Sequence, residues 1–136
     1  MALTVKKVTV VSTRVEDKPG VLAKMTAALR EANINLMAMV GYPEGEGQAE
    51  LMFIPEDPAA LRALAAQEGV QITEEAAVWL EGPDQVGALC AFADKLAAEN
   101  INIVAGQATG AGGYFAAVFY FESEEVVDQV VKLMTG

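Results

Sequence analysis

The sequence of 136 residues contains no histidine and only one cysteine, Cys90. Without histidine, the chain lacks the commonest general base and the commonest metal ligand. A single cysteine forms neither a disulfide framework nor a cysteine-rich metal site, and a thiol without a histidine beside it is a poor nucleophile. We therefore expect no enzymatic activity, no catalytic residues, no metal and no cofactor, and we expect Cys90 to be buried and inert.

Positive charge is also scarce. The sequence has nine basic and 19 acidic residues, which gives a formal net charge of −10. Such a surface repels phosphate backbones and anionic lipid headgroups, and the one basic cluster is Lys6-Lys7. The stretch MALTVKKVTV at the N-terminus lacks a signal core, and no apolar run approaches membrane-spanning length. The sequence thus predicts no nucleic-acid partner, no membrane partner and a cytoplasmic location.

What the sequence has in quantity is apolar residues, which make up 53% of it. It also contains an internal repeat: a shift of 67 residues brings VEDKPGVLAKM into register with part of LEGPDQVGALCAF. Average residue usage would give about one or two identities over 22 aligned positions. The identical pairs are Asp17/Asp84, Gly20/Gly87, Leu22/Leu89, Leu29/Leu96, Asn33/Asn100, Ile34/Ile101, Asn35/Asn102 and Ala38/Ala105.

The first copy predicts two helices among four strands. Alternating Val and Thr indicate a first strand, and Asn33 suits a helix end because asparagine tolerates the left-handed conformation. Asp57-Pro58 gives an N-cap followed by proline at the first helical position. The predicted series is strand 4–16, a helix burying Val21, Leu22, Met25, Ala28, Leu29 and Ala32, strand 34–42, turn 43–47, strand 48–54, helix 58–68 and strand 70–74.

The second copy follows the same order. Its glycine-rich segment 110–113 lies between two strands, so it predicts a flexible hairpin and not a phosphate-binding loop. The predicted series is strand 77–81, helix 86–99, strand 101–108, turn 109–113, strand 114–121 and a helix that begins at Ser123 and buries Val126, Val127, Val130, Val131 and Met134.

These patterns predict an α+β fold of two tandem ferredoxin-like βαββαβ units with antiparallel sheets, one over residues 1–74 and one over residues 75–136. The second unit lacks a last strand of its own, because the matching positions would be 137–141. An open sheet edge invites pairing. We therefore expect the edge of strand 77–82 to be covered by the long N-terminal strand or by a partner chain.

The corner between the first strand and the first helix of each copy is the candidate ligand site. A helix N-terminus offers unpaired N–H groups, and a glycine there lets a carboxylate approach the backbone. Asp17 and Asp84 add a carboxylate for an ammonium group. Asn35 and Asn102 each add a donor and an acceptor. The alternative is that the glycines only form a tight turn, the aspartates only cap helices and the asparagines only join helix to strand.

The stretch D-K-P-G-V-L, followed by a helix that ends in N-I-N-L, resembles the ACT domain, a ligand-sensing module of many amino-acid-biosynthesis enzymes and regulators. The resemblance extends from about residue 8 to the C-terminus, although the second copy reads D-Q-V-G-A-L, with Val86 in place of proline. It implies that ligands bind between paired domains, at this corner and near the start of the next strand. The residues it points to are Asp17, Lys18, Gly20, Val21, Asn35, Asp84, Gly87, Ala88 and Asn102.

The resemblance implies a non-enzymatic regulatory module that binds a small ligand, an amino acid or a close relative, and acts on an enzyme or regulator in trans. It also implies a homo-oligomer, with a dimer as the expected form. Family members often carry asparagine where this chain has Asp17 and Asp84, so the acidic version disfavours acidic ligands. The alternative is a structural or protein-interaction module whose ligand site has decayed. An acylphosphatase-like enzyme is disfavoured, because Lys18 and Gln85 stand where its phosphate-binding arginine would be.

Overall fold

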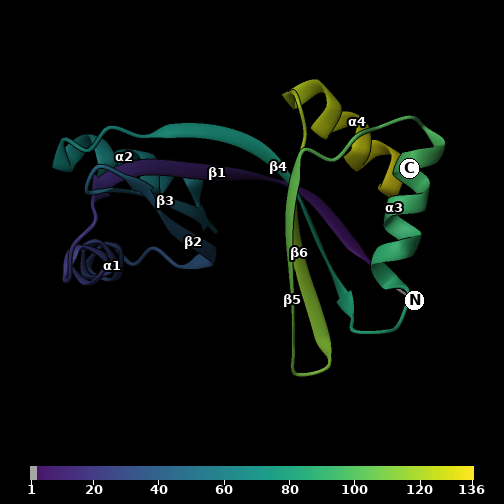
Figure 1. The fold of residues 1–136 in the computed structure, drawn as a ribbon, viewed down its shortest axis with the longest axis horizontal. Helices are drawn as coiled ribbons and strands as arrows, with labels where there is room; N and C mark the ends of the chain where they lie inside the picture. The colour runs from purple at the N-terminus through teal and green to yellow at the C-terminus, as the bar shows by residue number, and fades with distance from the viewer. Residues whose placement is uncertain (1–2) are drawn as a thin grey trace. The chain divides into compact units, whose positions relative to one another are not determined.

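The computed structural model describes residues 3–136 (Figure 1). Its six strands pair in the hydrogen-bonded order β2-β3-β1-β4-β6-β5, and the pairs whose register is defined are antiparallel. The elements in chain order are β1 (Thr4–Glu16), α1 (Val21–Glu31), β2 (Leu36–Gly45), β3 (Gln48–Pro55), α2 (Pro58–Glu68), β4 (Thr73–Pro83), α3 (Ala88–Ala98), β5 (Ala105–Ala111), β6 (Tyr114–Tyr120) and α4 (Glu124–Thr135).

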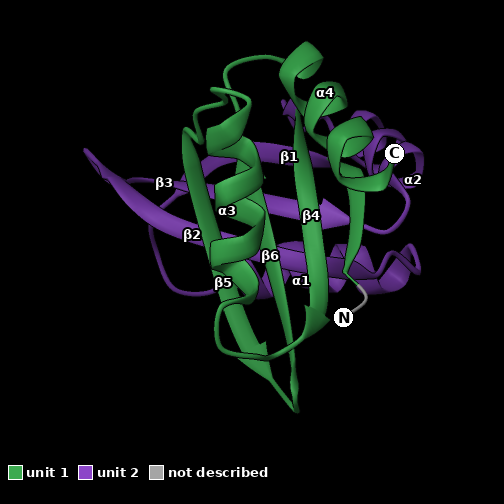
Figure 2. Ribbon diagram, turned by 90° about the vertical axis from the view of Figure 1, so that its right-hand side faces the viewer, with its two compact units in different colours: residues 1–8, 76–136 green, residues 9–75 purple. Residues whose placement is uncertain are grey.

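The chain divides into two compact units (Figure 2). One is Thr9–Glu75, with α1, α2 and the strand order β2-β3-β1-β4. The other combines Met1–Val8 with Ala76–Gly136 and has α3, α4 and the strand order β1-β4-β6-β5. Both orders are those of a βαββαβ ferredoxin-like unit, so the predicted fold class is confirmed.

Strand β1 serves both units, which explains how the second unit manages without a last strand of its own. Its first residues, up to Val8, belong to the unit that contains α3 and α4, although the sequence groups them with the first copy. Val5 is buried there beside Val78 and Leu80. The N-terminal strand, and not a partner chain, therefore lies along β4.

The same strand is tied to α4 by charge. The Lys7 ammonium lies 2.9 Å from the Asp128 carboxylate and also contacts Glu124. Hydrogen bonds to these two carboxylates raise the pKa of Lys7 above its ordinary value. Residues separated by most of the chain are thus held together within one unit.

Each unit has its own hydrophobic core between its helices and its sheet. The smaller cluster consists of Val11, Leu29, Leu51, Phe53 and Leu61. The larger cluster consists of Val5, Val78, Leu80, Ala88, Phe92, Leu96, Phe115, Ala117, Phe121, Val127 and Val130.

The strands differ from the sequence prediction in three places. Strands predicted at 70–74 and 77–81 are one continuous strand, β4, because no turn residue separates them. The predicted turn 43–47 is shorter: β2 continues to Gly45, and only Glu46 and Gly47, both with positive φ, form the turn. Likewise, β5 begins at Ala105 and ends at Ala111, later than the predicted 101–108.

The predicted helix signals are largely confirmed. The Asp57 side chain accepts a hydrogen bond from the Ala60 N–H, 3.3 Å away, and the Ser123 hydroxyl accepts one from Val126. Asn33 follows α1 with a φ of 58°. The predicted buried face of α1 is partly wrong, since Leu22 and Ala32 are exposed while Leu29 is buried.

Candidate functional site

The corners before α1 and α3 have nearly the same backbone geometry. Gly20 and Gly87 are the N-cap residues, with φ values of 92° and 90°, a left-handed conformation that favours glycine. No side chain caps either helix. Asp17 and Asp84 are therefore not helix caps, and the first-turn N–H groups of both helices have no side-chain acceptor.

The space in front of both corners is open. A Cβ built on Gly20 or Gly87 meets no atom within 4 Å. The glycines are thus required by their backbone conformation and not by close packing. A ligand group can approach the backbone of either corner without displacing a neighbour.

A hydrogen bond ties each corner to the hairpin of its own unit. The Asp17 N–H donates to the Gly47 carbonyl over 2.8 Å, and the Asp84 N–H donates to the Gly113 carbonyl over 2.9 Å. Both aspartates are exposed. The repeat is therefore retained in the hydrogen bonding of the corners as well as in the residue pattern.

The two corners differ in their surroundings. Around the first, the Lys18 ammonium pairs with Glu16 over 3.1 Å, and Arg14 pairs with Glu44 over 2.9 Å. At the second, the Asp84 carboxylate lies so close to Gly110 that a Cβ there would be 2.7 Å from Oδ2. Within residues 3–136, ion-paired cations therefore lie beside the first corner and not beside the second.

Not all of the predicted ligand-binding residues lie together. Lys18, Gly20 and Val21 follow Asp17 directly, whereas Asn35 comes after the other end of α1. An 11-residue helix is about 16 Å long. Asp17 and Asn35 of one unit therefore lie too far apart to contact the same small ligand.

The second unit repeats this separation. Asp84 and Gly87 precede α3, and Asn102 follows it, with 11 helical residues between them. The side chain of Ala88, another predicted ligand-binding residue, is buried in the core. Asn102 is exposed and precedes β5.

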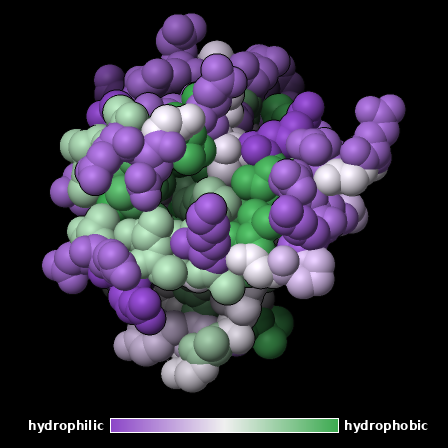
Figure 3. Space-filling model, turned by 90° about the vertical axis from the view of Figure 1, so that its left-hand side faces the viewer, coloured by the Kyte–Doolittle hydropathy of each residue, from purple (hydrophilic) through white to green (hydrophobic). Residues whose placement is uncertain are grey.

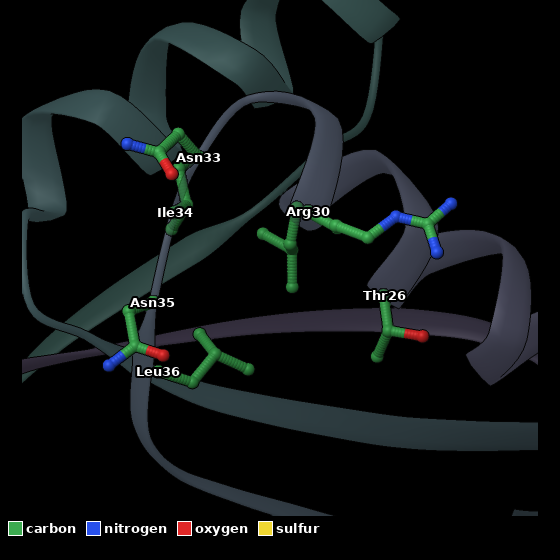
Figure 4. A pocket seen from close by; sticks show the side chains of 7 residues that line it. Thr26, Arg30, Asn33, Ile34, Asn35 and Leu36 are labelled. Carbon is green, nitrogen blue, oxygen red and sulfur yellow. The ribbon is translucent and has the colours of Figure 1, made fainter.

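A pocket of about 410 Å³ lies at the C-terminal end of α1 (Figure 4). Its position, and the residues Thr26 and Arg30 on its helical side, were not predicted from the sequence. Both are exposed polar residues on a helix, where such residues are common, so no local pattern distinguishes them. The pocket is lined by Thr26, Leu29, Arg30, Asn33, Ile34, Asn35 and Leu36.

The helix end beside this pocket is closed by backbone hydrogen bonds. The Ile34 N–H donates to the Leu29 carbonyl over 2.9 Å, and the Asn33 N–H donates to the Arg30 carbonyl over 3.0 Å. This is a Schellman motif with asparagine in the left-handed position. The Asn33 and Asn35 side chains form no hydrogen bond within residues 3–136.

The predicted burial of Cys90 is wrong. Cys90 is exposed, because it lies on the outer face of α3, where its thiol is 3.6 Å from the Asp94 carboxylate.

Within residues 3–136, no three His, Cys, Asp or Glu side chains are grouped to hold a metal ion. None of the described helices is long and apolar enough to cross a bilayer. The face that carries α1 and α2 is mostly hydrophilic, with apolar residues between the polar ones (Figure 3).

Comparisons with solved structures find chains of the same fold. A crystal structure of a protein from Bacteroides thetaiotaomicron is 22% identical with a TM-score of 0.80, over 96% of this chain and 90% of that one. The regulatory subunit of aspartate kinase from Thermus thermophilus, in a ligand-free form, is 16% identical with a TM-score of 0.62, over 98% and 94%. A structure of aspartokinase alpha and beta subunits is 16% identical with a TM-score of 0.64, over 98% and 95%.

No curated protein matches the sequence significantly. The family comparison matches residues 9–68 to the ACT domain. This stretch contains the corner at Gly20, the helix end at Asn33 and most of the unit Thr9–Glu75. Residues 9–68 of this chain are therefore similar to the ACT domain.

Proposed function

We propose that this chain is a non-enzymatic regulatory protein of the cytoplasm, which binds an amino acid and acts on a partner protein in trans. The observation that carries the proposal is the open corner with a left-handed glycine at Gly20, repeated at Gly87. The similarity of residues 9–68 to the ACT domain supports a regulatory role. So does the fold shared with a chain described as a regulatory subunit of aspartate kinase.

At the first corner, the ligand's α-carboxylate accepts hydrogen bonds from the N–H groups that begin α1, next to Gly20 and Val21. Its ammonium group pairs with the Asp17 carboxylate, and Lys18 lies in the same loop. The site therefore binds a zwitterion better than a dicarboxylate, because the second carboxylate of a dicarboxylate would lie near the negatively charged Asp17 and be repelled.

The predicted contact from Asn35 requires a corner other than that of its own unit, and we propose that a second copy of the chain supplies it. Because α1 separates Asn35 from the corner of its own unit by about 16 Å, a ligand that contacts both groups lies between two chains. We therefore propose a homodimer. Ligand binding then favours one arrangement of the two chains, and a partner enzyme or regulator responds to that arrangement.

We also propose that the second unit is an ACT domain. The chain would then consist of two ACT domains, with their boundary near residue 75. Its support is the repeated geometry of the corners and helix ends, including φ values of 58° and 56° at Asn33 and Asn100. Asp84, Gly87 and Asn102 then form the second candidate site, with Ala88 contributing its backbone. Val86 in place of proline makes this site the weaker one.

The experiment is a thermal-shift screen of the purified chain against the twenty amino acids. A ligand at 100 times its Kd adds about 2.7 kcal/mol, or several degrees in Tm. Asp17→Asn should reduce the shift strongly and Asp84→Asn less, with Asp94→Asn on the outer face of α3 as the control. Light scattering with and without the ligand tests the dimer. No shift with any amino acid would contradict the proposal and favour a protein-docking module.

A further inference from the structure

The pocket at the end of α1 carries an arginine without a partner. Of the three arginines, Arg14 pairs with Glu44 and Arg62 with Glu74, whereas Arg30 forms no ion pair or side-chain hydrogen bond within residues 3–136. No acidic residue lines the pocket. In a chain with a net charge of −10, this is a locally positive site.

The repeat shows that this charge belongs to the first unit alone. The 67-residue offset keeps both asparagines of the pocket, as Asn100 and Asn102, and its apolar members, as Leu96, Ile101 and Ile103. The two helical polar residues are lost: Ala93 stands in place of Thr26, and Ala97 in place of Arg30. The second unit therefore has the equivalent asparagines and apolar residues but lacks the arginine.

The helix end does not cancel the charge. Helix C-termini carry a partial negative charge on their last carbonyls, which disfavours an anion. Here the Leu29 and Arg30 carbonyls accept hydrogen bonds from Ile34 and Asn33. Because these acceptors are occupied, the Arg30 guanidinium is the main charge that a ligand in the pocket meets.

We propose that this pocket binds a small aliphatic carboxylate, at a site separate from the corner at Gly20. The carboxylate pairs with the guanidinium of Arg30, whose planar donors match two carboxylate oxygens. The aliphatic part lies on Leu29, Ile34 and Leu36. The Asn33 and Asn35 carboxamides, across the pocket from Arg30 in Figure 4, supply a donor and an acceptor for a further polar group.

No acidic residue lines the pocket, and this should make the pocket selective for ligands without an ammonium group. A free ammonium group would have no carboxylate to pair with in this pocket, so a simple carboxylate should bind better than the matching amino acid. The corner, which has Asp17, has the opposite preference. The two ends of α1 therefore recognise different classes of small molecule.

The test is a titration of the ¹⁵N-labelled full chain with 4-methylpentanoate, followed by NMR. The side-chain amides of Asn33 and Asn35 and the Arg30 Nε–H should shift, while those of Asn100 and Asn102 should not. The neutral amide 4-methylpentanamide should produce much smaller shifts, because it lacks the charge. Leucine should produce weaker shifts than 4-methylpentanoate at Asn33 and Arg30, which the proposed amino-acid site does not contact.

Arg30→Ala should weaken binding of 4-methylpentanoate at least about tenfold, because it removes a charge-assisted hydrogen bond. The affinity of Arg30→Lys should lie between those of the wild type and Arg30→Ala. Arg62→Ala is the control, because it changes the net charge by the same amount. Asp17→Asn should leave the shifts of Asn33 and the Arg30 Nε–H unchanged, which separates this proposal from the amino-acid site; Asn35 is left out of this comparison because the proposed amino-acid site also contacts it. Equal shifts in both units, or no shifts at Asn33 and Asn35, would overturn the proposal even if an amino acid binds at the corner.

Discussion

The Phe119 ring lies directly against the backbone of Gly106 on the neighbouring strand. A Cβ at Gly106 would be 2.5 Å from Cδ1 and 2.7 Å from Cε1 of Phe119. The same ring stacks on Phe92 with centroids 5.0 Å apart. The absence of a side chain at Gly106 thus allows the aromatic pair to pack against edge strand β5.

Gly106→Ala should therefore destabilise the chain by about 1–3 kcal/mol, the usual cost of overpacking. Urea unfolding measures the loss. In the double variant Gly106→Ala with Phe119→Leu, the loss should be smaller than the sum of the two single effects. Additive effects would contradict the contact.

Gly20→Ala should destabilise the chain by about 1–2 kcal/mol through backbone strain alone. The added Cβ meets no atom within 4 Å, so packing contributes nothing. Gly20→Asn should reduce the free energy of unfolding by less, because asparagine tolerates a left-handed backbone. Chemical denaturation of the three proteins compares them, and equal stability of the alanine variant would show that the corner adopts another conformation.

Val5→Ala and Val11→Ala form a matched pair on one strand. Each truncation should cost about 2 kcal/mol. Because Val5 lies in one core and Val11 in the other, hydrogen exchange should accelerate in α3 and α4 for the first variant and in α1 and α2 for the second. The same loss of protection in all four helices would mean that the two units unfold together.

Glu74→Gln should lower stability at neutral pH but not at acid pH. Arg62 donates to both Glu74 oxygens, over 2.8 and 2.7 Å, and these hydrogen bonds hold the pKa of Glu74 below its ordinary 4.5. Stabilisation by a carboxylate with a lowered pKa is complete above 4.5 and is lost as the pH falls through the folded-state pKa.

The Tm difference between the wild type and Glu74→Gln should therefore shrink as the pH falls below about 4.5. Glu75→Gln is the control, since Glu75 is exposed and forms no ion pair within residues 3–136. A difference that does not change with pH would show that the pair in α2 and β4 makes no electrostatic contribution.

Much of the fold could be predicted because its signals are local. Asp57 and Ser123 cap their helices, and Asn33 ends α1, through contacts made within a few residues. The repeat placed the two glycine corners at equivalent positions for the same reason. Helix exposure was predicted less well, as Leu22 and Cys90 show, because burial depends on which neighbours pack against each face.

The candidate site was only half predictable. Asp17, Gly20 and Asn35 were identified from a motif, but a motif gives no distances, and α1 separates the corner from Asn35. Arg30 has no local pattern that distinguishes it from any other exposed helical arginine. Only the folded chain shows that it lines a pocket with Asn33 and Asn35.

By itself, the sequence determined the element order, the ferredoxin-like topology and the glycine corners, because alternation, helix caps and left-handed positions are properties of neighbouring residues. Only the tertiary structure decided that β1 serves two cores, that β4 is one strand and that a pocket lies at the C-terminal end of α1. These features depend on pairing between residues such as Val5 and Val78, which lie far apart in the chain. Strand alternation shows which face a residue occupies, but not which strand lies beside it.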